Sequence, residues 1–410
     1  MIKSIHIRSI VSVAAVLLLT LVVSCNKFEY AYDENNPGVA NPNESLLNFT
    51  VSWDKANLAS GHKPENVTVL MGRKVNSLHY AWNLDGNGAF IFPEEPEGSE
   101  ATETPESSET PEVPEADQTT TPVISKGEYY AIAFSDDAHF YNLSSYEQFA
   151  QDVSVSMTEL YAEVPAIPDE EVSQDRNFID FNAYAGFIKH ADEPLYMDIM
   201  KNVSCSSNET SVVITPTNLT RTLTFKLLSR SEEGVTVDGI SAVLSGVVTK
   251  VQLMSGLMTR SNTAKLAFEL TKCGKESVEE KDKVVEYDVY EGSVKLLGVF
   301  SADDRAYITG PGIFQVAVTA SVTDNGKHKQ RVFHAGLNLK PILDELELMV
   351  LSDDKTGYTM KPQNQISKIA ISTPLHVMKN QILASDTEGL VQWKDNDVEI
   401  MPEEKPEIIE

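Results

Sequence analysis

The stretch LLNFTVSW, residues 46–53, alternates apolar and polar side chains along its whole length. Four apolar residues fall on one face of this stretch: Leu47, Phe49, Val51 and Trp53. Because successive side chains of a β-strand point to opposite faces, a period of two predicts a strand with one face against a core. The stretch therefore predicts a sheet protein in which these four residues face the interior.

The same rhythm recurs along the chain. Further runs rich in β-branched and aromatic residues lie at 67–71, 78–82, 126–134, 212–214, 221–227, 243–251, 293–300, 313–322 and 330–339. Residues 85–88 (DGNG) and 323–326 (TDNG) carry the Asp, Asn and Gly that tight hairpin turns favour. Only 144–152 and 341–348 suggest short helices. Many short strands and little helix indicate an all-β fold, which we predict as two tandem antiparallel β-sandwich domains.

The length and composition are sufficient for two domains, since the chain has 410 residues of which 41% are hydrophobic. We predict a first sandwich at 46–209 and a second at 210–352. For the C-terminal extension, residues 353–410, the sequence leaves added strands, a donor segment and a loose tail open. Residues 93–122 hold ten acidic residues and six prolines but no Lys, Arg or aromatic residue. We expect them to form a disordered loop within the first domain, the alternative being a linker between domains.

The N-terminus has the features of an export signal. Lys3 and Arg8 precede an uncharged, mostly apolar run from Ile10 to Val23. This run is too short to span a membrane as a helix. The run ends in four residues that resemble the lipobox read by lipoprotein signal peptidase: Val22, Val23, Ser24 and Cys25. We therefore predict a lipoprotein signal peptide at 1–24, and an acylated Cys25 with a flexible tether at 25–45. A plain secretory peptide with an incidental cysteine is the alternative.

The location follows from the same motif. No aspartate comes directly after Cys25, so the resemblance points to the outer membrane, with the protein lipid-anchored at the cell surface. The sequence does not fix the leaflet. Cys205 and Cys273 remain in the mature chain, and an oxidising compartment permits a disulfide between them. Two buried free thiols also fit, and the spacing leaves both arrangements open.

The charge balance excludes nucleic acid as a partner. The chain carries 61 acidic and 33 basic residues, a formal net charge of -28, and loss of Lys3 and Arg8 with the signal leaves 61 against 31, or -30. Binding to phosphates needs a basic face, and none is visible. An acidic surface also repels an anionic membrane, so the lipid on Cys25 must supply the anchoring.

The sequence contains no catalytic or metal motif, so we predict no enzymatic activity, metal site or cofactor. It lacks GxSxG, HExxH, GxxxxGK and paired CxxC, and its eight histidines are scattered. The pairs Asp303-Asp304 and Asp353-Asp354 lack the frame of a calcium loop, and we interpret them as solvated turns. Three tryptophans are candidates for a sugar-stacking platform: Trp53, Trp82 and Trp393. The first two lie in alternating strands and are interpreted as core residues.

Several phrases of the sequence occur in a recognisable order. They are LLNFTVSW, VTVLMGR (67–73), GEYYAIAF (127–134), ADEPLYMD (191–198), TRTLTFKLL (220–228) and LSGVVTKVQLMSG (244–256). Together with the lipobox, these phrases resemble the fimbrillin-type lipoproteins of Bacteroidales over residues 25–345. The resemblance implies two transthyretin-like sandwiches and a fimbrial anchor or accessory subunit. The acidic insert at 93–122 and the ending GLVQWKDNDVEI depart from the pattern and suggest a less characterised branch.

This resemblance implies a role in assembling a filament, without catalysis. Shaft subunits of the family lose an N-terminal strand to an arginine-specific protease, and a strand from a neighbouring subunit fills the groove. Anchors keep their lipid, and here no arginine occurs between Cys25 and Arg73. The resemblance therefore implies an anchor or assembly subunit with an uncleaved first strand, which binds fimbrial subunits by β-strand addition.

Two other classes of function remain open. A surface glycan-binding lipoprotein of a polysaccharide-uptake system also combines a lipid tether with tandem β-sandwiches, but it needs two or more solvent-facing aromatic rings in a shallow groove. A lipoprotein hydrolase needs a polar pocket with converging titratable groups, and the sequence shows none.

Overall fold

The computed structural model describes residues 43–54, 58, 63–74, 79–91, 122–135, 138, 140–144, 156–168, 186–280, 283–307, 309–324, 326–360, 366–384 and 390–392. The described residues from Ser45 onward form one compact unit. The predicted signal peptide, Cys25, the predicted tether up to residue 42 and the acidic loop up to residue 121 lie outside the described residues, as does the predicted helix beyond Ser144. The last two residues of the predicted tether, Glu44 and Ser45, belong to the first strand. Among the described residues, no helix is both long and apolar enough to span a membrane.

The N-terminal half contains two sheets. The larger sheet has the strand order β13 (Thr217–Asn218), β11 (Tyr196–Cys205), β6 (Gly127–Ser135), β2 (Asn66–Arg73), β3 (His79–Asp85) and β4 (Phe90–Ile91). The smaller sheet has the order β12 (Glu209–Ile214), β1 (Glu44–Val51) and β5 (Val123–Ser125). One hydrophobic cluster contains side chains from both sheets, including Leu47, Val69 and Tyr129. The two sheets therefore form the first sandwich around a shared core.

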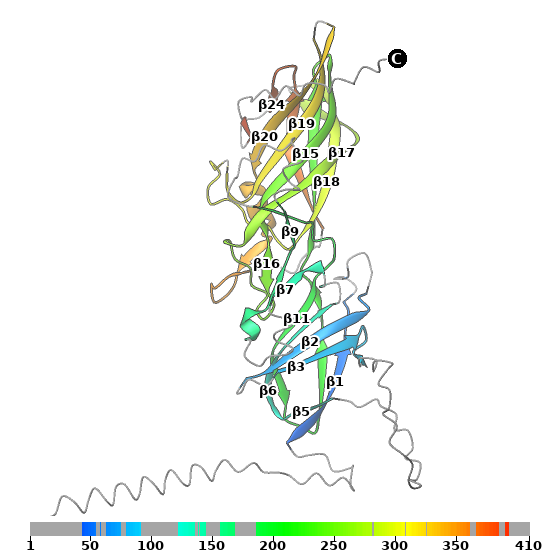
Figure 1. The fold of residues 1–410 in the computed structure, drawn as a ribbon. Coiled ribbons are helices and arrows are strands. Elements are labelled where there is room, and N and C mark those ends of the chain that lie inside the picture. The colour runs from blue at the N-terminus through cyan, green and yellow to red at the C-terminus, as the bar shows by residue number, and fades with distance from the viewer. Residues whose placement is uncertain are drawn as a thin grey trace, which may run out of the picture. The chain divides into compact units, whose positions relative to one another are not determined.

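The C-terminal half is built on an eleven-stranded sheet. Its main path is β24 (Ile382–Ala384), β23 (Ile366–Val377), β14 (Arg221–Ser231), β18 (Lys283–Leu296), β17 (Thr263–Glu280), β15 (Val235–Val248), β19 (Ile313–Asp324), β20 (Lys327–Asn338) and β25 (Leu390–Gln392). The short strands β10 (Phe187–Ile188) and β9 (Ala166–Ile167) complete it. Figure 1 shows β15, β17, β18, β19 and β20 side by side.

This large sheet curls over its own core. Phe225 of β14 stacks on Phe314 of β19 with the ring centroids 4.9 Å apart and the planes 4° from parallel. The two strands are separated by β18, β17 and β15 in the strand order, so only a folded sheet brings their inner faces together. The second half is therefore also a sandwich.

Short elements connect the two halves. β7 (Asn142–Ser144), β8 (Tyr161–Glu163) and β16 (Lys250–Gln252) form a small sheet, beside a 3-10 helix at Met157–Glu159. After β20 the chain forms α4 (Lys340–Leu346), β21 (Met349–Leu351) and β22 (Tyr358–Met360). The largest hydrophobic cluster runs from Leu70 and Ile132 of the first sandwich to Val248 and Phe314 of the second. The two sandwiches thus share buried side chains.

The predicted all-β fold is confirmed, and every predicted strand overlaps an observed one. The short helix predicted at 341–348 is α4. Most of the described strand pairs are antiparallel, as predicted, but β1 pairs with β12, β10 with β17 and β14 with β23 in parallel. Parallel neighbours need a long connection between them, which local turn signals cannot reveal.

The strand pairing also shows which half of the chain the strands after residue 209 join. β12 pairs with β1 and β13 pairs with β11, so residues up to Asn218 belong to the sheets of the N-terminal half. β23, β24 and β25 join the large sheet. Of the three alternatives for residues 353–410, the structure thus selects added strands at 366–377, 382–384 and 390–392.

Candidate functional site

The small sheet of the first sandwich holds the first strand after the predicted tether. β1 lies between β12 and β5, and Leu47 is fully buried while Phe49 and Val51 are each 7% exposed. Leu47 N–H donates a hydrogen bond to Pro122 O at 3.0 Å, on the β5 side. The alternation read from the sequence is therefore correct, and β1 is an integral strand of the sandwich.

Aromatic rings of β1 and of the residues after it pack against rings of the six-stranded sheet. Phe49 contacts Trp82 and Phe90, with ring centroids 5.9 Å and 5.5 Å away. The Trp53 indole N–H donates to Gly86 O at 2.8 Å, and its ring meets that of Tyr196 edge-on. Both tryptophans are half-buried against the core, as predicted. Trp393 lies outside the described residues.

The turn predicted at residues 85–88 is the β3–β4 hairpin. The Asp85 carboxylate accepts hydrogen bonds from the N–H groups of Asn87, Gly88 and Ala89 at 2.8–2.9 Å. The bond from Ala89 has the largest effect and lowers the pKa of Asp85; burial has the next largest effect and opposes it, but the bonds from Asn87 and Gly88 add to the lowering, so the pKa lies below its usual value. Gly88 has φ +109°, and a Cβ there would lie 2.6 Å from Phe49 O. The motif is therefore a hairpin that abuts β1.

The outer face of the small sheet exposes apolar side chains. Leu46 of β1, Val123 of β5 and Val213 of β12 are 40%, 49% and 61% exposed. Each of them has a buried neighbour in sequence, namely Leu47, Ile124 and Val212 or Ile214. Since side chains of a strand alternate between faces, the three exposed residues lie on the face opposite the core. The register places Leu46 opposite Glu209 and Val213 opposite Thr50, so these apolar side chains are separated by polar residues of the same face.

The edge of β12 is the second feature of this sheet. Leu46 N–H donates to Asn208 O and Ser52 N–H donates to Ile214 O, both at 2.8 Å. Because backbone groups alternate in direction along a strand, those of Ser211 and Val213 point away from β1. Among the described residues, no strand pairs with β12 on that side. The edge can therefore receive a further strand.

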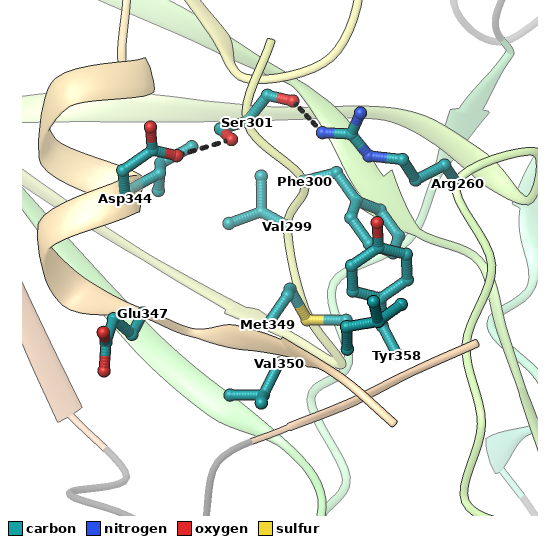
Figure 2. A pocket seen from close by; sticks show the side chains of 11 residues that line it. Arg260, Val299, Phe300, Ser301, Asp344, Glu347, Met349, Val350 and Tyr358 are labelled. Carbon is teal, nitrogen blue, oxygen red and sulfur yellow. Dashed lines mark hydrogen bonds between the residues drawn. The ribbon is translucent and has the colours of Figure 1, made fainter. Parts of the chain in front are cut away.

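A cleft of about 530 Å³ lies beside α4 in the C-terminal half. Figure 2 shows Phe300, Met349 and Tyr358 forming its apolar wall, with Asp344 of α4 and Glu347, the residue that follows α4, on the other side. The rings of Phe300 and Tyr358 meet edge-on at 5.0 Å, and the Arg260 guanidinium lies 5.5 Å from the Phe300 centroid. The cleft is thus an apolar space with charged groups at its rim.

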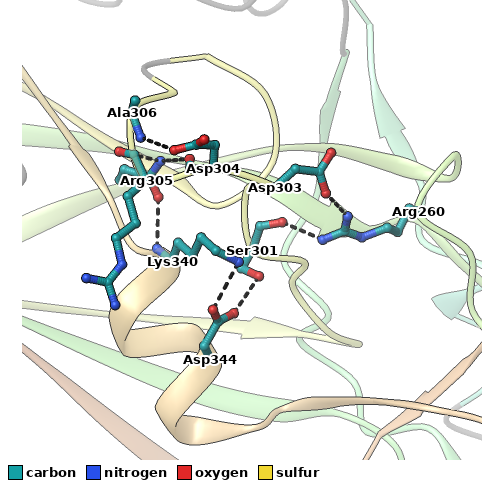
Figure 3. Close-up of polar contacts among 9 residues, drawn as sticks. Arg260, Ser301, Asp303, Asp304, Arg305, Ala306, Lys340 and Asp344 are labelled. Carbon is teal, nitrogen blue, oxygen red and sulfur yellow. Dashed lines mark hydrogen bonds and ion pairs between the residues drawn. The ribbon is translucent and has the colours of Figure 1, made fainter.

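The charges at this rim bind one another (Figure 3). Arg260 forms an ion pair with Asp303 and donates to Ser301 O at 2.7 Å. Asp344 accepts from the Ser301 hydroxyl at 2.8 Å and pairs with Lys340 at 3.0 Å. Burial raises the pKa of Asp344, but these two partners outweigh it and the pKa lies below its usual value. The network holds α4 to the loop between β18 and β19. It does not resemble the side-chain arrangement of an active site.

The acidic pairs singled out in the sequence have structural partners. The Asp304 carboxylate accepts from Ala306 N–H at 2.9 Å, while Asp303 binds Arg260. The Asp354 carboxylate accepts from the Ser352 hydroxyl and from Thr356, which lowers the pKa of Asp354 to about 2. In the part of the chain that the structure describes, no group of three His, Cys, Asp or Glu side chains is placed to hold a metal ion. One member of each pair, Asp304 and Asp354, therefore stabilises its own turn.

The remaining predicted site residues are not brought together. Cys205 is buried on β11 and Cys273 is exposed on β17, and both thiols are free in two different sheets. The expectation that two free thiols would both be buried holds only for Cys205. The lipobox, Val22, Val23, Ser24 and Cys25, lies outside the described residues.

The rings that a glycan-binding groove requires are also dispersed. Among the described residues the large exposed apolar side chains include two aromatic ones, Tyr130 and Tyr307, which are 37% and 51% exposed. Tyr130 belongs to β6 of the first sandwich, with Lys74 4.8 Å above its ring, and Tyr307 lies in the loop between β18 and β19. No observation here favours the glycan-binding alternative.

Comparison with solved structures finds weak similarity to proteins described as adhesins and fimbrial proteins. A candidate adhesin from Bacteroides ovatus is similar at a TM-score of 0.43 with 11% identity, over 85% of this chain and 94% of that one. The fimbrial anchor protein Mfa2 from Porphyromonas gingivalis is similar at 0.35 with 10% identity, over 80% and 90%.

A fimbrial assembly protein from Parabacteroides distasonis is similar at a TM-score of 0.27 with 10% identity, over 83% of this chain and 93% of that one. No protein-family model matches the chain, and no curated protein sequence does either. With TM-scores below 0.5, these structural likenesses carry no argument about what this chain does.

Proposed function

We propose that this chain is a non-catalytic outer-membrane lipoprotein that acts as a fimbrial anchor or assembly subunit. In this proposal the acylated Cys25 holds it in the membrane, and a partner subunit joins it by β-strand addition. The observation that carries the proposal is the position of β1. The first strand fills its own place in the sandwich, with Leu47 fully buried, so the fold is complete without a donated strand there.

The position of the first arginine supports retention of this strand. Arg73 is the first arginine after Cys25, and it ends β2, which pairs with both β3 and β6. Its guanidinium donates to Lys126 O at 2.7 Å. A protease that cuts after arginine would have to open the six-stranded sheet to reach this site. The chain thus has the character of an anchor and not of a shaft subunit that loses its first strand.

The edge of β12 is where we place the incoming strand. It offers the outward backbone groups of Ser211 and Val213, together with the exposed apolar side chain of Val213. Main-chain hydrogen bonds would supply affinity, and the apolar residues of the outer face would contact alternate side chains of the donor. β12 also lies next to β1, so the load on a bound subunit would pass directly into the strand that follows the tether.

A substitution at this edge tests the proposal. Proline at Ser211 removes an N–H group that points away from β1, so it should block an added strand while leaving the β1–β12 pairing intact. We would purify the lipidated protein from outer membranes in mild detergent, wash with high salt and identify bound proteins by mass spectrometry. We expect fimbrial subunits with the native chain and with the control Ser211→Ala, and their loss with Ser211→Pro at an unchanged melting temperature.

Each other outcome has a clear meaning. Equal recovery of fimbrial subunits with Ser211→Pro would place the contact elsewhere on the molecule. Recovery of an uptake porin and its lipoproteins would replace the fimbrial role with glycan capture. Cys25→Ser tests the anchor separately, because loss of the acylated thiol should move the protein out of the membrane fraction and abolish incorporation of labelled palmitate.

A further inference from the structure

The short hairpin of β21 and β22 is fixed to the second half of the molecule through β22. Tyr358 of β22 and Met258, in the loop between β16 and β17, exchange backbone hydrogen bonds of 2.8 Å and 2.9 Å. On its other side β22 pairs with β21, from Met349↔Met360 to Leu351↔Tyr358. Among the described residues, no strand pairs with β21 on the side opposite β22. β21 is therefore the edge of a small sheet that is held firmly from behind.

The backbone of this edge is oriented to bind a strand. Ser352 N–H donates to Gly357 O at 2.9 Å, so the backbone groups of Ser352 point to the β22 side. Because backbone groups alternate in direction along a strand, those of Met349 and Leu351 point away from β22. The other strand agrees, since Tyr358 lies opposite Leu351 and turns its own backbone groups away from β21.

The cleft beside α4 lies along this edge. Met349, Val350 and Leu351 all line the cleft, and Figure 2 shows the first two beside it. Adjacent side chains of a strand point to opposite faces, so a space that touches all three residues lies beside the strand and not over one of its faces. β22 fills the other side of β21. An extended segment that paired with β21 would therefore lie in the cleft.

The side chains along this edge are apolar. Val350 and Leu351 are 40% and 45% exposed, although both are large apolar residues of one strand. Phe300 and Leu343, which line the same cleft, are 2% and 4% exposed and belong to the largest hydrophobic cluster. An apolar side chain that enters the cleft would cover Val350 and Leu351 and extend this cluster, which removes apolar surface from water.

The charges at the rim of the cleft favour a basic ligand. Residues 340–347 read KPILDELE, with three acidic residues and one lysine. Asp344 and Glu347 line the cleft, as does the basic residue Arg260. Arg260 and Lys340 already form ion pairs with acidic side chains. A lysine or arginine of the ligand would thus meet a surplus of negative charge, whereas an acidic ligand would be repelled.

We propose that this edge and the cleft form a docking site for an extended segment of a partner protein, in which an apolar residue stands beside a lysine or arginine. The segment would pair with β21 through the backbone groups of Met349 and Leu351 and insert its apolar side chain into the cleft. β12 belongs to a different sheet in the N-terminal half. The proposal therefore does not depend on the function proposed above, and one chain can bind two segments at once.

Selection from random seven-residue peptides displayed on phage tests this site. The target is the full chain in mild detergent, and each selection is repeated on Leu351→Pro, which removes an N–H group that points away from β22. Ser211→Pro places the same change on the edge of β12 and is the control. We expect peptides with an apolar residue beside lysine or arginine to bind the native chain and the control at least about tenfold more tightly than Leu351→Pro.

The sequences that are enriched decide between the possible occupants. Equal binding to the native chain and to Leu351→Pro would overturn the proposal. Enrichment of acidic peptides would also overturn it, because the rim would then not select a cation. Peptides that match an exposed stretch of this chain would assign the site to a second copy and not to a partner protein.

Hydrogen exchange in the native chain provides a test that does not require Leu351→Pro to fold. An enriched peptide should slow amide exchange at Met349 and Leu351 by at least about tenfold, because these N–H groups would become bonded. Exchange at Val350, which points to β22, and at Ser211 and Val213 of β12 should not change. Unchanged exchange at Met349 and Leu351 would overturn the proposal even if the peptide binds.

The role of charge has its own variant. Glu345→Gln combined with Glu347→Gln keeps the size of both side chains and removes two negative charges from the rim. Binding of a lysine-containing peptide should weaken by about threefold to tenfold at low salt, and the difference from the native chain should vanish at high salt because ions screen exposed charges. Equal affinity at low salt would overturn the selection of a basic segment.

Discussion

At the scale of single residues, two adjacent leucines at the start of β1 differ in how deeply they are buried. Leu46 is 40% exposed on the outer face of the small sheet, whereas Leu47 is fully buried between the two sheets. We expect Leu47→Ala to lower the free energy of unfolding by about 2–5 kcal/mol and Leu46→Ala by less than about 0.5 kcal/mol. Urea denaturation followed by tryptophan fluorescence measures both. Similar values for the two variants would contradict the placement of β1 in the core.

Asp85 gives a prediction that depends on pH. Its carboxylate accepts three backbone hydrogen bonds in the β3–β4 turn, which lower its pKa in the folded state. A lowered pKa means that the charged form stabilises the fold above the ordinary carboxyl range, and that this stability is lost as the pH falls through the folded-state pKa.

We therefore expect Asp85→Ala to be less stable than the native protein by about 1 kcal/mol at pH 7, with the difference shrinking as the pH falls below about 4. Urea denaturation at a series of pH values measures the difference. Asp353→Ala, at an exposed acidic residue of another turn, is the control. A difference that grows on acidification would refute this role for Asp85.

At the scale of elements, Asn338 joins the end of β20 to two neighbours. Its buried side-chain amide donates to Asp304 O at 2.9 Å and Tyr307 O at 2.8 Å, and its Oδ1 accepts from Lys340 N–H at 2.9 Å at the start of α4. One side chain thus fixes both the loop after Ser301 and the first turn of the helix that lines the cleft.

Asn338→Ala should therefore remove these hydrogen bonds and cost about 1–3 kcal/mol of unfolding free energy. Hydrogen exchange should accelerate at Lys340 and in residues 303–307 before the sheet is affected. Asn48→Ala, at a half-exposed residue of β1, is the control and should leave this region unchanged. Unchanged protection at Lys340 in Asn338→Ala would show that the side chain does not hold the helix.

At the scale of the whole molecule, the two free cysteines lie in different sheets and should differ in their reactivity toward a thiol reagent. Cys205 belongs to the six-stranded sheet and Cys273 to the large one. Burial raises the pKa of the Cys205 thiol, so it holds little reactive thiolate, while Cys273 is exposed. We expect a thiol reagent to modify Cys273 in the native protein and Cys205 only after unfolding. If neither reacts until a reductant is added, the two residues form a disulfide.

The sequence predicted the elements well and their partners poorly, for a physical reason. A period of two depends on local alternation, so the strands at 46–51, 127–135 and 313–324 and the turn at 85–88 were readable directly. Pairing depends on which segments meet in space. The parallel register of β1 with β12 joins residues far apart in sequence, and no local signal encodes it.

The candidate site shows the same division. The burial of Leu47, Phe49 and Val51 and the lack of an early arginine were visible in the sequence, because both are local properties. The exposed edge of β12 and the apolar cleft beside α4 were not, because each is made by several distant segments.

The sequence by itself thus determined the all-β character, the first buried strand, the two hairpins and the excess of acidic residues. Only the tertiary structure decided that residues 366–392 add strands to the large sheet, that β12 belongs to the first sandwich, and that the two cysteines stay apart. The reason is that side-chain periodicity and charge are local properties of the sequence. Strand order instead depends on how whole faces of the sheets pack against one another, which brings distant segments together.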